Sequence, residues 1–285
     1  MSGIEVRNVT KTYGRTVALN DLSVDFGENK IYGLLGRNGA GKTTLLNIIN
    51  NRIFADSGSV STDGESCVEN DKVQSKMYLM SEKTYYPEKM KVKDVYKWTK
   101  SFYPDFDMEY ADQLAVKFSL DTDKRVDSLS TGYNSIVKLI AALCVNTPYV
   151  FFDEPVLGLD ANYRDLFYRL LIEKYSMNPC TMILSTHLIG EVSGVVEHVV
   201  IINKGQIIRN ESTEKLLSNG YTVTGTAARV DEFVMDKNVI GFDVLGGLKT
   251  AYILGEHPVT ACEGLEISKM DLQKLFVKLT NDQEA

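Results

Sequence analysis

The chain has 285 residues, of which 44% are hydrophobic and 24% are charged, as is usual for a globular protein of one large domain or two smaller ones. Its 31 Lys and Arg residues against 38 Asp and Glu residues give a net charge of −7, which argues against DNA, RNA or anionic lipid as the main partner. No apolar run reaches the ~18 residues that cross a bilayer, and the N-terminus carries neither a secretory signal nor an N-myristoylation pattern. We therefore expect a cytoplasmic protein that binds no nucleic acid.

The first half of the chain begins with strands and then changes to a strand–loop–helix unit. Alternating apolar residues before residue 30 predict short antiparallel strands with one buried face. Residues 30–35 predict a compact buried strand that runs directly into Gly36, and residues 42–51 place Leu and Ile at helical intervals. Turns and further strand are expected over residues 56–80.

The middle of the chain alternates between helices and strands. Two helices are predicted over residues 92–120, separated by Pro104, and a third over residues 130–145. The all-apolar run 149–152 is typical of a strand buried on both faces. The elements expected next are a helix over 162–175, a strand over 181–185, a helix over 188–195 and a strand over 198–203. This alternation predicts an α/β fold whose parallel sheet is covered by helices on both faces.

The C-terminal part has a different texture. Residues 221–260 form short strand-like pieces with several glycines, and Ser268 together with Asp271 predicts the cap of a last helix. We expect a small α+β accessory domain over residues 219–285. The apolar stripe of its last helix would consist of Leu272, Leu275, Phe276 and Leu279.

The cysteines carry no pattern that indicates chemistry. They form no C-x-x-C pair and match no zinc spacing, so we expect them to be reduced and to serve as small apolar residues. The four are Cys67, Cys144, Cys180 and Cys262.

A glycine-rich segment predicts nucleotide binding. Residues 36–43, Gly-Arg-Asn-Gly-Ala-Gly-Lys-Thr, match the pattern G-x-x-x-x-G-K-[ST]. Backbone N–H groups of such a loop surround a β-phosphate, and the following helix presents its positive N-terminus to the same anion. Lys42 can reach the β- and γ-phosphates, and the Thr43 hydroxyl can bind Mg²⁺. The segment therefore predicts ATP or GTP binding.

Two further segments have both a chemical and a plain interpretation. Asp153 and Glu154 follow the buried strand, where the first can accept a hydrogen bond from Mg²⁺-bound water and the second can polarise an attacking water. The alternative is an ordinary solvated loop end. Ser130 and Gly132 open a helix, either as a simple N-terminal cap or as a second anion-binding turn that receives a γ-phosphate.

Over residues 1 to about 218 the order of these motifs resembles that of ATP-binding cassette (ABC) ATPases. The resemblance implies a P-loop NTPase with a RecA-like core, an antiparallel β subdomain and a helical subdomain inserted over about residues 84–135. It extends to the nucleotide-binding subunits of bacterial ABC-2-type exporters, including those for antimicrobial or amphipathic peptides. Besides the phosphate loop, the matching motifs are Leu-Ser-Thr-Gly-Tyr at 129–133, Phe-Phe-Asp-Glu-Pro at 151–155, Gly-Leu-Asp at 158–160 and Ser-Thr-His at 185–187.

The resemblance also implies roles for the matching residues. Glu154 and His187 would be catalytic, with His187 at the γ-phosphate, and Tyr13 would stack on adenine. ATP would lie between the phosphate loop of one subunit and the Ser130 turn of another in a head-to-tail dimer. The implied Mg²⁺ ligands are Thr43, Asp153 and Ser81. The implied nucleotide-binding residues are Tyr13, Gly36, Asn38, Gly39, Ala40, Gly41, Lys42, Thr43, Thr44, Ser130, Thr131, Gly132 and Asp160, of which Asp160 would couple the two sites.

The chain departs from the family's pattern at two places. Ser81 stands where the family usually has Gln, and the shorter side chain would reach Mg²⁺ only through water. Thr131 and Tyr133 replace the commoner Gly and Gln. Ser130 and Gly132, which would face the phosphate, are kept, so we expect activity to survive.

The resemblance predicts the ATP-hydrolysing subunit of a bacterial ABC transporter, and an exporter in particular. ATP binding would close the dimer and hydrolysis would reopen it, which would drive a separate transmembrane permease from the inner face of the membrane. The second ATPase subunit would be an identical or a sister chain, and the aromatic-rich residues 84–128 would dock on the permease. An importer subunit and a soluble ABC ATPase are the alternatives, and the transported substrate stays open.

Overall fold

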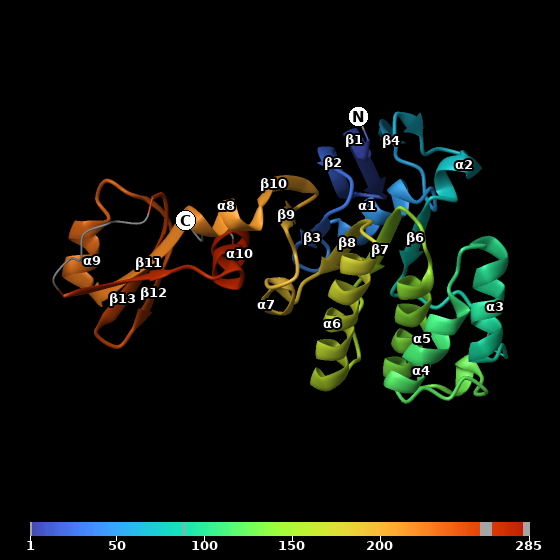
Figure 1. Ribbon diagram of the computed structural model, residues 1–285. Coiled ribbons are helices and arrows are strands. Elements are labelled where there is room, and N and C mark those ends of the chain that lie inside the picture. The colour runs from blue at the N-terminus through green and yellow to red at the C-terminus, as the bar shows by residue number, and fades with distance from the viewer. Residues whose placement is uncertain (1, 88, 257–263, 282–285) are drawn as a thin grey trace.

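The computed structural model describes residues 2–87, 89–256 and 264–281, and Cys262 lies outside these ranges. Figure 1 shows a large lobe that contains the N-terminus and a smaller lobe built from the C-terminal residues, joined through two short helices. Within the described residues, Cys67, Cys144 and Cys180 are buried free thiols, which agrees with the apolar role predicted for them.

The large lobe is organised around a mixed sheet of six strands. Their spatial order is β10 (Gln206–Ser212), β9 (His198–Asn203), β3 (Ile31–Leu35), β8 (Thr181–Thr186), β7 (Tyr149–Asp153) and β6 (Met77–Met80). The strands from β9 to β6 run parallel to their neighbours, and β10 pairs antiparallel at one edge. Strands β3, β7 and β8 are buried along their whole length, which explains why their central residues are apolar. The predicted parallel sheet is confirmed.

The register of these strands gathers the later site at one edge of the sheet. Leu35 at the end of β3 pairs with Thr186 of β8, and Asp153 at the end of β7 pairs with Ser185 of β8. The loops that follow β3, β7 and β8 therefore begin side by side, which is where ligands bind in open α/β sheets.

Helices cover both faces of the sheet. Alternate residues of β7 enter two different apolar clusters: Phe151 packs with α1 and the antiparallel strands, whereas Phe152 packs with the helices of the other face. The helices in these layers are α1 (Lys42–Ile49), α5 (Thr131–Cys144), α6 (Ala161–Met177) and α7 (Ile189–Val192). The helix expected over residues 188–195 is thus shorter than predicted.

Two smaller units flank the sheet. The antiparallel unit has the order β2 (Thr16–Phe26), β1 (Ile4–Tyr13), β4 (Ser57–Thr62) and β5 (Glu65–Ser66), and it confirms the antiparallel strands predicted from alternation. A short helix, α2 (Asp71–Gln74), follows β5 and was not predicted. The helical unit lies between β6 and α5 and contains α3 (Val92–Phe102), α4 (Met108–Lys117) and the 3₁₀ turn Val126–Ser128.

The smaller lobe is an antiparallel sheet with a helix on each side. After α8 (Thr213–Ser218) come β11 (Gly220–Thr226), α9 (Ala227–Phe233), β12 (Asn238–Leu245), β13 (Leu248–Leu254), β14 (Leu265–Lys269) and α10 (Leu272–Thr280), in the sheet order β12-β13-β11-β14. Helix α9 shares an apolar cluster with the sheet, and α10 packs between the sheet and α7. Figure 1 shows α10 beside the junction of the two lobes.

One predicted cap is wrong in this lobe. Ser268 lies inside strand β14, where it pairs with Thr222, and it takes no part in the cap. Asp271 alone caps α10, because its carboxylate accepts a hydrogen bond of 2.7 Å from the Lys274 N–H.

Candidate nucleotide-binding site

The loop after β3 takes its shape from glycines at positions that no other residue fits. Gly39 and Gly41 have φ angles of +79° and +111°, in the left-handed region. A Cβ atom at Gly41 would lie 2.5 Å from the carbonyl oxygen of Ala18 in β2, and one at Gly36 would lie 2.7 Å from the carbonyl oxygen of Ile202. The loop therefore packs directly on backbone, and its peptide groups line the space in front of α1.

Lys42 is held inside this loop. Its side chain is only 5% exposed, and its ammonium group donates a hydrogen bond of 2.7 Å to the carbonyl oxygen of Gly36. The same ammonium lies 3.5 Å from a carboxylate oxygen of Glu154. A buried positive charge thus stands beside the acid that follows β7.

Asp153 is nearly inaccessible and is held by two hydroxyl groups. It is 2% exposed, and one carboxylate oxygen accepts hydrogen bonds from Thr43 at 3.2 Å and Ser185 at 2.9 Å. Burial raises the pKa of Asp153 above its ordinary value, and the two hydrogen bonds oppose that shift. The first helical turn of α1 and the ends of β7 and β8 therefore meet at one carboxylate.

Glu154 and His187 contact each other across the ends of β7 and β8. The Glu154 carboxylate lies 2.9 Å from His187 Nδ1 and accepts a hydrogen bond of 3.3 Å from the Thr186 hydroxyl. Glu154 has a φ of +49°, a conformation that residues other than glycine rarely adopt. Lys42, Thr186 and His187 therefore hold the Glu154 side chain in place, and the backbone of Glu154 has an unusual conformation.

These elements enclose a cleft of about 450 Å³. Glu154 after β7, the phosphate loop and Tyr13 at the end of β1 come together in its lining. Among the lining residues, Ala18, Glu82 and Leu157 were not predicted. The lining residues are Tyr13, Ala18, Asn38, Gly39, Ala40, Gly41, Lys42, Thr43, Thr44, Glu82, Glu154, Leu157 and His187.

Other predicted site residues lie outside this cleft. Ser130 caps α5 by accepting a hydrogen bond of 3.3 Å from the Tyr133 N–H, and Asp160 caps α6 by accepting one of 2.9 Å from the Tyr163 N–H. Gly132 packs against the loop before α6, since a Cβ atom there would lie 2.7 Å from the carbonyl oxygen of Gly158. The Ser130 turn, which comprises residues 130–132, therefore lies next to the Asp160 loop and does not line the cleft. Its Thr131 lines an adjacent pocket of about 240 Å³ together with Glu82, Glu154 and Leu157.

Ser81 also lies outside the cleft. It lines a neighbouring pocket of about 300 Å³, whereas the next residue, Glu82, lines the cleft itself. The Mg²⁺ contact predicted for Ser81 stays a prediction.

The parallel sheet, the glycine loop before α1 and the acids at the end of the neighbouring strand define a P-loop nucleotide hydrolase. Residues 19–157 match the family described as "ABC transporter". The chain is 32% identical over 219 residues to the uncharacterized ABC transporter ATP-binding protein MJ1023 of Methanocaldococcus jannaschii, a match that covers 75% of this chain and 79% of that protein. The chain belongs to the ABC transporter ATP-binding family, and it is an ATPase that couples ATP hydrolysis to transport.

Two other relatives have names that state opposite directions of transport. The petrobactin import ATP-binding protein YclP of Bacillus subtilis is 27% identical over 75% of this chain and 88% of its own length. The lipopolysaccharide export system ATP-binding protein LptB of Haemophilus influenzae is 28% identical over 77% of this chain and 94% of its own length.

A solved structure agrees with the fold. The dimeric, post-hydrolysis ATP-binding cassette MJ0796 bound to ADP and Pi matches with a TM-score of 0.65 and 22% identity, over 74% of this chain and 98% of that one. Among the helices of residues 2–87, 89–256 and 264–281, none combines the length and the apolar character needed to cross a membrane.

Proposed function

We propose that this chain is the ATP-hydrolysing subunit of a bacterial exporter, and that it works as a head-to-tail dimer on the inner face of the membrane. The proposal of a dimer is supported by the separation of the phosphate loop and the Ser130 turn within one chain. The phosphate loop and Glu154 line the cleft, whereas Ser130 does not line it and is exposed at the start of α5. A second chain, identical or sister, would bring its Ser130 turn to the first chain's cleft.

Within the cleft, the phosphate loop would bind the triphosphate and Tyr13 would stack on the base. Lys42 would exchange its contact with the Gly36 carbonyl for the β- and γ-phosphates, which are stronger acceptors because they are charged. Tyr13 suits stacking because it is 51% exposed at the end of β1.

The residues present also fit Mg²⁺, which prefers hard oxygen ligands. Thr43 and Asp153 supply a hydroxyl and a carboxylate that already share a hydrogen bond of 3.2 Å. When bound, Mg²⁺ would neutralise negative charge on the phosphate oxygens.

Glu154 is the residue that we assign as general base. Its carboxylate lines the cleft and is oriented by His187, so it can accept a proton from an attacking water. His187 is half-buried and lines the same cleft, where it can contact the γ-phosphate.

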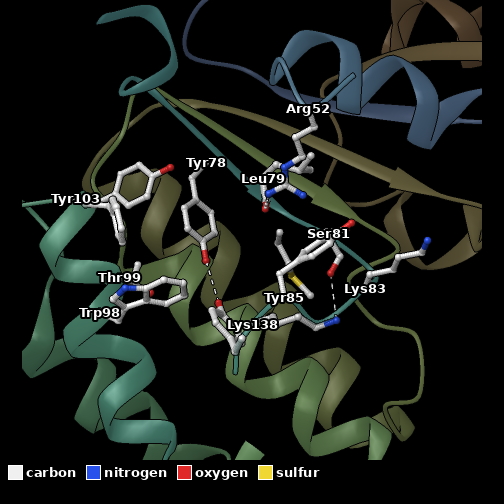
Figure 2. A pocket seen from close by; sticks show the side chains of 13 residues that line it. Arg52, Tyr78, Leu79, Ser81, Lys83, Tyr85, Trp98, Thr99, Tyr103 and Lys138 are labelled. Carbon is white, nitrogen blue, oxygen red and sulfur yellow. Dashed lines mark hydrogen bonds between the residues drawn. The ribbon is translucent and has the colours of Figure 1, made fainter. Parts of the chain in front are cut away.

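The neighbouring pocket supports a permease as the partner. Figure 2 shows Tyr78, Tyr85, Trp98 and Tyr103 around it, from β6, α3 and the segments next to them. Arg52 lies over the Tyr85 ring at 5.4 Å and adds a positive charge to the rim. Tyr85 and Phe102 are each 64% exposed, and exposed aromatic rings of this kind are frequent anchors at protein interfaces. A cytoplasmic segment of the permease would insert here.

For the direction of transport, the size of the accessory domain and the names of relatives are the relevant observations. The accessory domain that we propose over residues 219–285 is small, and LptB is an export-system protein, whereas YclP is an import protein. The assignment names no cargo.

Purification from native membranes in mild detergent tests the permease. We expect the wild-type chain to retain a membrane protein with several apolar helices, and a Tyr85→Ala/Phe102→Ala variant to lose it while keeping its basal ATPase activity. Phe54→Ala removes another exposed ring (55% exposed) that does not line the pocket, and it is the matched control. Retention of the membrane protein by the double variant, or recovery of ribosomes instead, would contradict the proposal.

A further inference from the structure

A buried lysine joins the Ser130 turn's helix to the nucleotide cleft. Lys138 lies in the middle of α5 and is only 7% exposed, which is rare for lysine unless its charge is paired. Among the ion pairs of the described residues, none includes Lys138. Its ammonium group instead donates hydrogen bonds to two backbone carbonyls, those of Ser81 at 3.1 Å and of Glu82.

The two carbonyls belong to the loop that follows β6. Glu82 lines the nucleotide cleft, and Ser81 lines the aromatic pocket on the other side. Figure 2 shows the Lys138 side chain in the lining of the aromatic pocket, with its ammonium group bonded to Ser81. One ammonium group thus holds the loop at the point where it separates the two spaces.

The same face of α5 holds the loop after β7. The Ser135 hydroxyl, three residues before Lys138, donates a hydrogen bond of 3.0 Å to the carbonyl of Leu157, and Leu157 also lines the cleft. Helix α5 is therefore attached by side chains to two of the loops that border the cleft, those after β6 and β7. Its N-terminal end is the Ser130 turn, so a shift of either loop is transmitted to that turn.

We propose that Lys138 is a positioning residue that transmits nucleotide occupancy from Glu82 to the Ser130 turn. A charged ammonium group suits this role because its hydrogen bonds are stronger than those of a neutral donor. Since the acceptors are backbone carbonyls, the link does not depend on which side chains stand at 81 and 82. The chain has Ser, not Gln, at position 81. Lys138 connects the same loop to α5 through the carbonyls of Ser81 and Glu82. The inference rests on the proposed nucleotide cleft, in which Glu82 lies near the bound ligand.

The test uses Lys138→Met in the full-length chain, because methionine keeps the length of the side chain and removes its donors. We expect kcat for ATP hydrolysis to fall at least about tenfold, as misplaced catalytic groups do, while KM for ATP stays within about twofold. Lys174→Met is the matched control: Lys174 is another buried helical lysine, but it bonds to Asn146 far from the cleft.

Hydrogen exchange of the same proteins separates positioning from a loss of stability. With a non-hydrolysable ATP analogue and Mg²⁺, the wild-type chain should gain protection at residues 81–84 and 130–135, and the variant at 81–84 only. Unchanged kcat, or protection at both segments in Lys138→Met, would overturn the inference. So would a parallel loss of kcat, nucleotide affinity and unfolding temperature that exceeds the effect of Lys174→Met. Absence of protection at 81–84 in the wild-type chain would overturn the proposed cleft itself.

Discussion

The phosphate loop and the Ser130 turn differ in how fully one chain builds their surroundings. Lys42 in the loop is buried, bonded to backbone and close to an acid, and a cleft lies in front of it. Ser130 is exposed, and its side chain caps its own helix by accepting a hydrogen bond from the Tyr133 N–H. Both segments precede a helix N-terminus suited to an anion. The difference teaches that a single chain builds a nucleotide cleft around its phosphate loop, whereas under the proposed function the Ser130 turn completes the site of a second chain.

The largest expected effect comes from Glu154→Gln. Hydrolysis should fall about 100- to 10,000-fold, the usual contribution of a general base, because an amide cannot accept the proton. ATP binding should persist, and light scattering should detect a nucleotide-bound dimer that does not reopen. Glu214→Gln, at an exposed position of α8, is the control. Full hydrolysis by the Glu154 variant would place the base at another residue.

A mixing experiment tests whether the two segments act across chains. Lys42→Ala should weaken ATP binding on the order of 100-fold, because it removes charged hydrogen bonds to phosphate. Ser130→Arg should leave binding intact and block closure, so each variant alone should be inactive. An equal mixture should recover about a quarter of wild-type activity, since half of the dimers are mixed and each has one intact site. No recovery would mean either that the site is complete within one chain or that the second subunit is a sister chain.

Substitution of Tyr13 should have a smaller effect, and only on ATP binding. Tyr13→Ala should weaken ATP binding about tenfold, as expected for a stacking energy of ~1–3 kcal/mol, and Tyr13→Phe should not. Fluorescence titration with ATP and with inorganic tripolyphosphate makes the comparison, because only ATP carries a base. Equal losses for both ligands would show that Tyr13 acts through the shape of the loop.

The smallest effect concerns stability. Because burial raises the pKa of Asp153 above its ordinary 3.8, the folded state binds a proton that the unfolded state releases. The free energy of unfolding should therefore decrease as the pH rises from 3.8 through the raised pKa. Asp153→Asn should remove this dependence and raise the nucleotide-free unfolding midpoint at neutral pH by about 2–4 °C. Asp165→Asn, at an exposed carboxylate on α6, should do neither.

The sequence predicted the central sheet well because its signals are local. A continuous apolar run before the glycine loop and helical spacing after it are enough to define β3 and α1. Helices α2 and α9 were missed because they have four and seven residues, too few to show a helical period. The cap at Ser268 was assigned to the wrong element, since pairing with Thr222 is a long-range contact that a local pattern does not reveal.

The candidate site shows the same limit. Tyr13, Lys42, Glu154 and His187 were predicted from motifs, and the fold brings them to one cleft. Glu82 was missed because the family's pattern points to position 81 and carries no signal for the residue beside it, which lies in a bend after β6. In the structure Ser81 lines the aromatic pocket and Glu82 lines the nucleotide cleft.

The contact between α10 and α7 makes the C-terminal helix part of the apolar core of the large lobe. Leu272, Leu275 and Phe276 of α10 belong to the same apolar cluster as Ile189 and Val192 of α7, which begins two residues after His187. A fragment cut at residue 218 would leave that part of the cluster facing water, so a shortened expression product would be prone to aggregate. A tag or fusion added after α10 would disturb a helix that packs against α7, next to His187. The N-terminus lies away from this junction in Figure 1 and is the safer place for a tag.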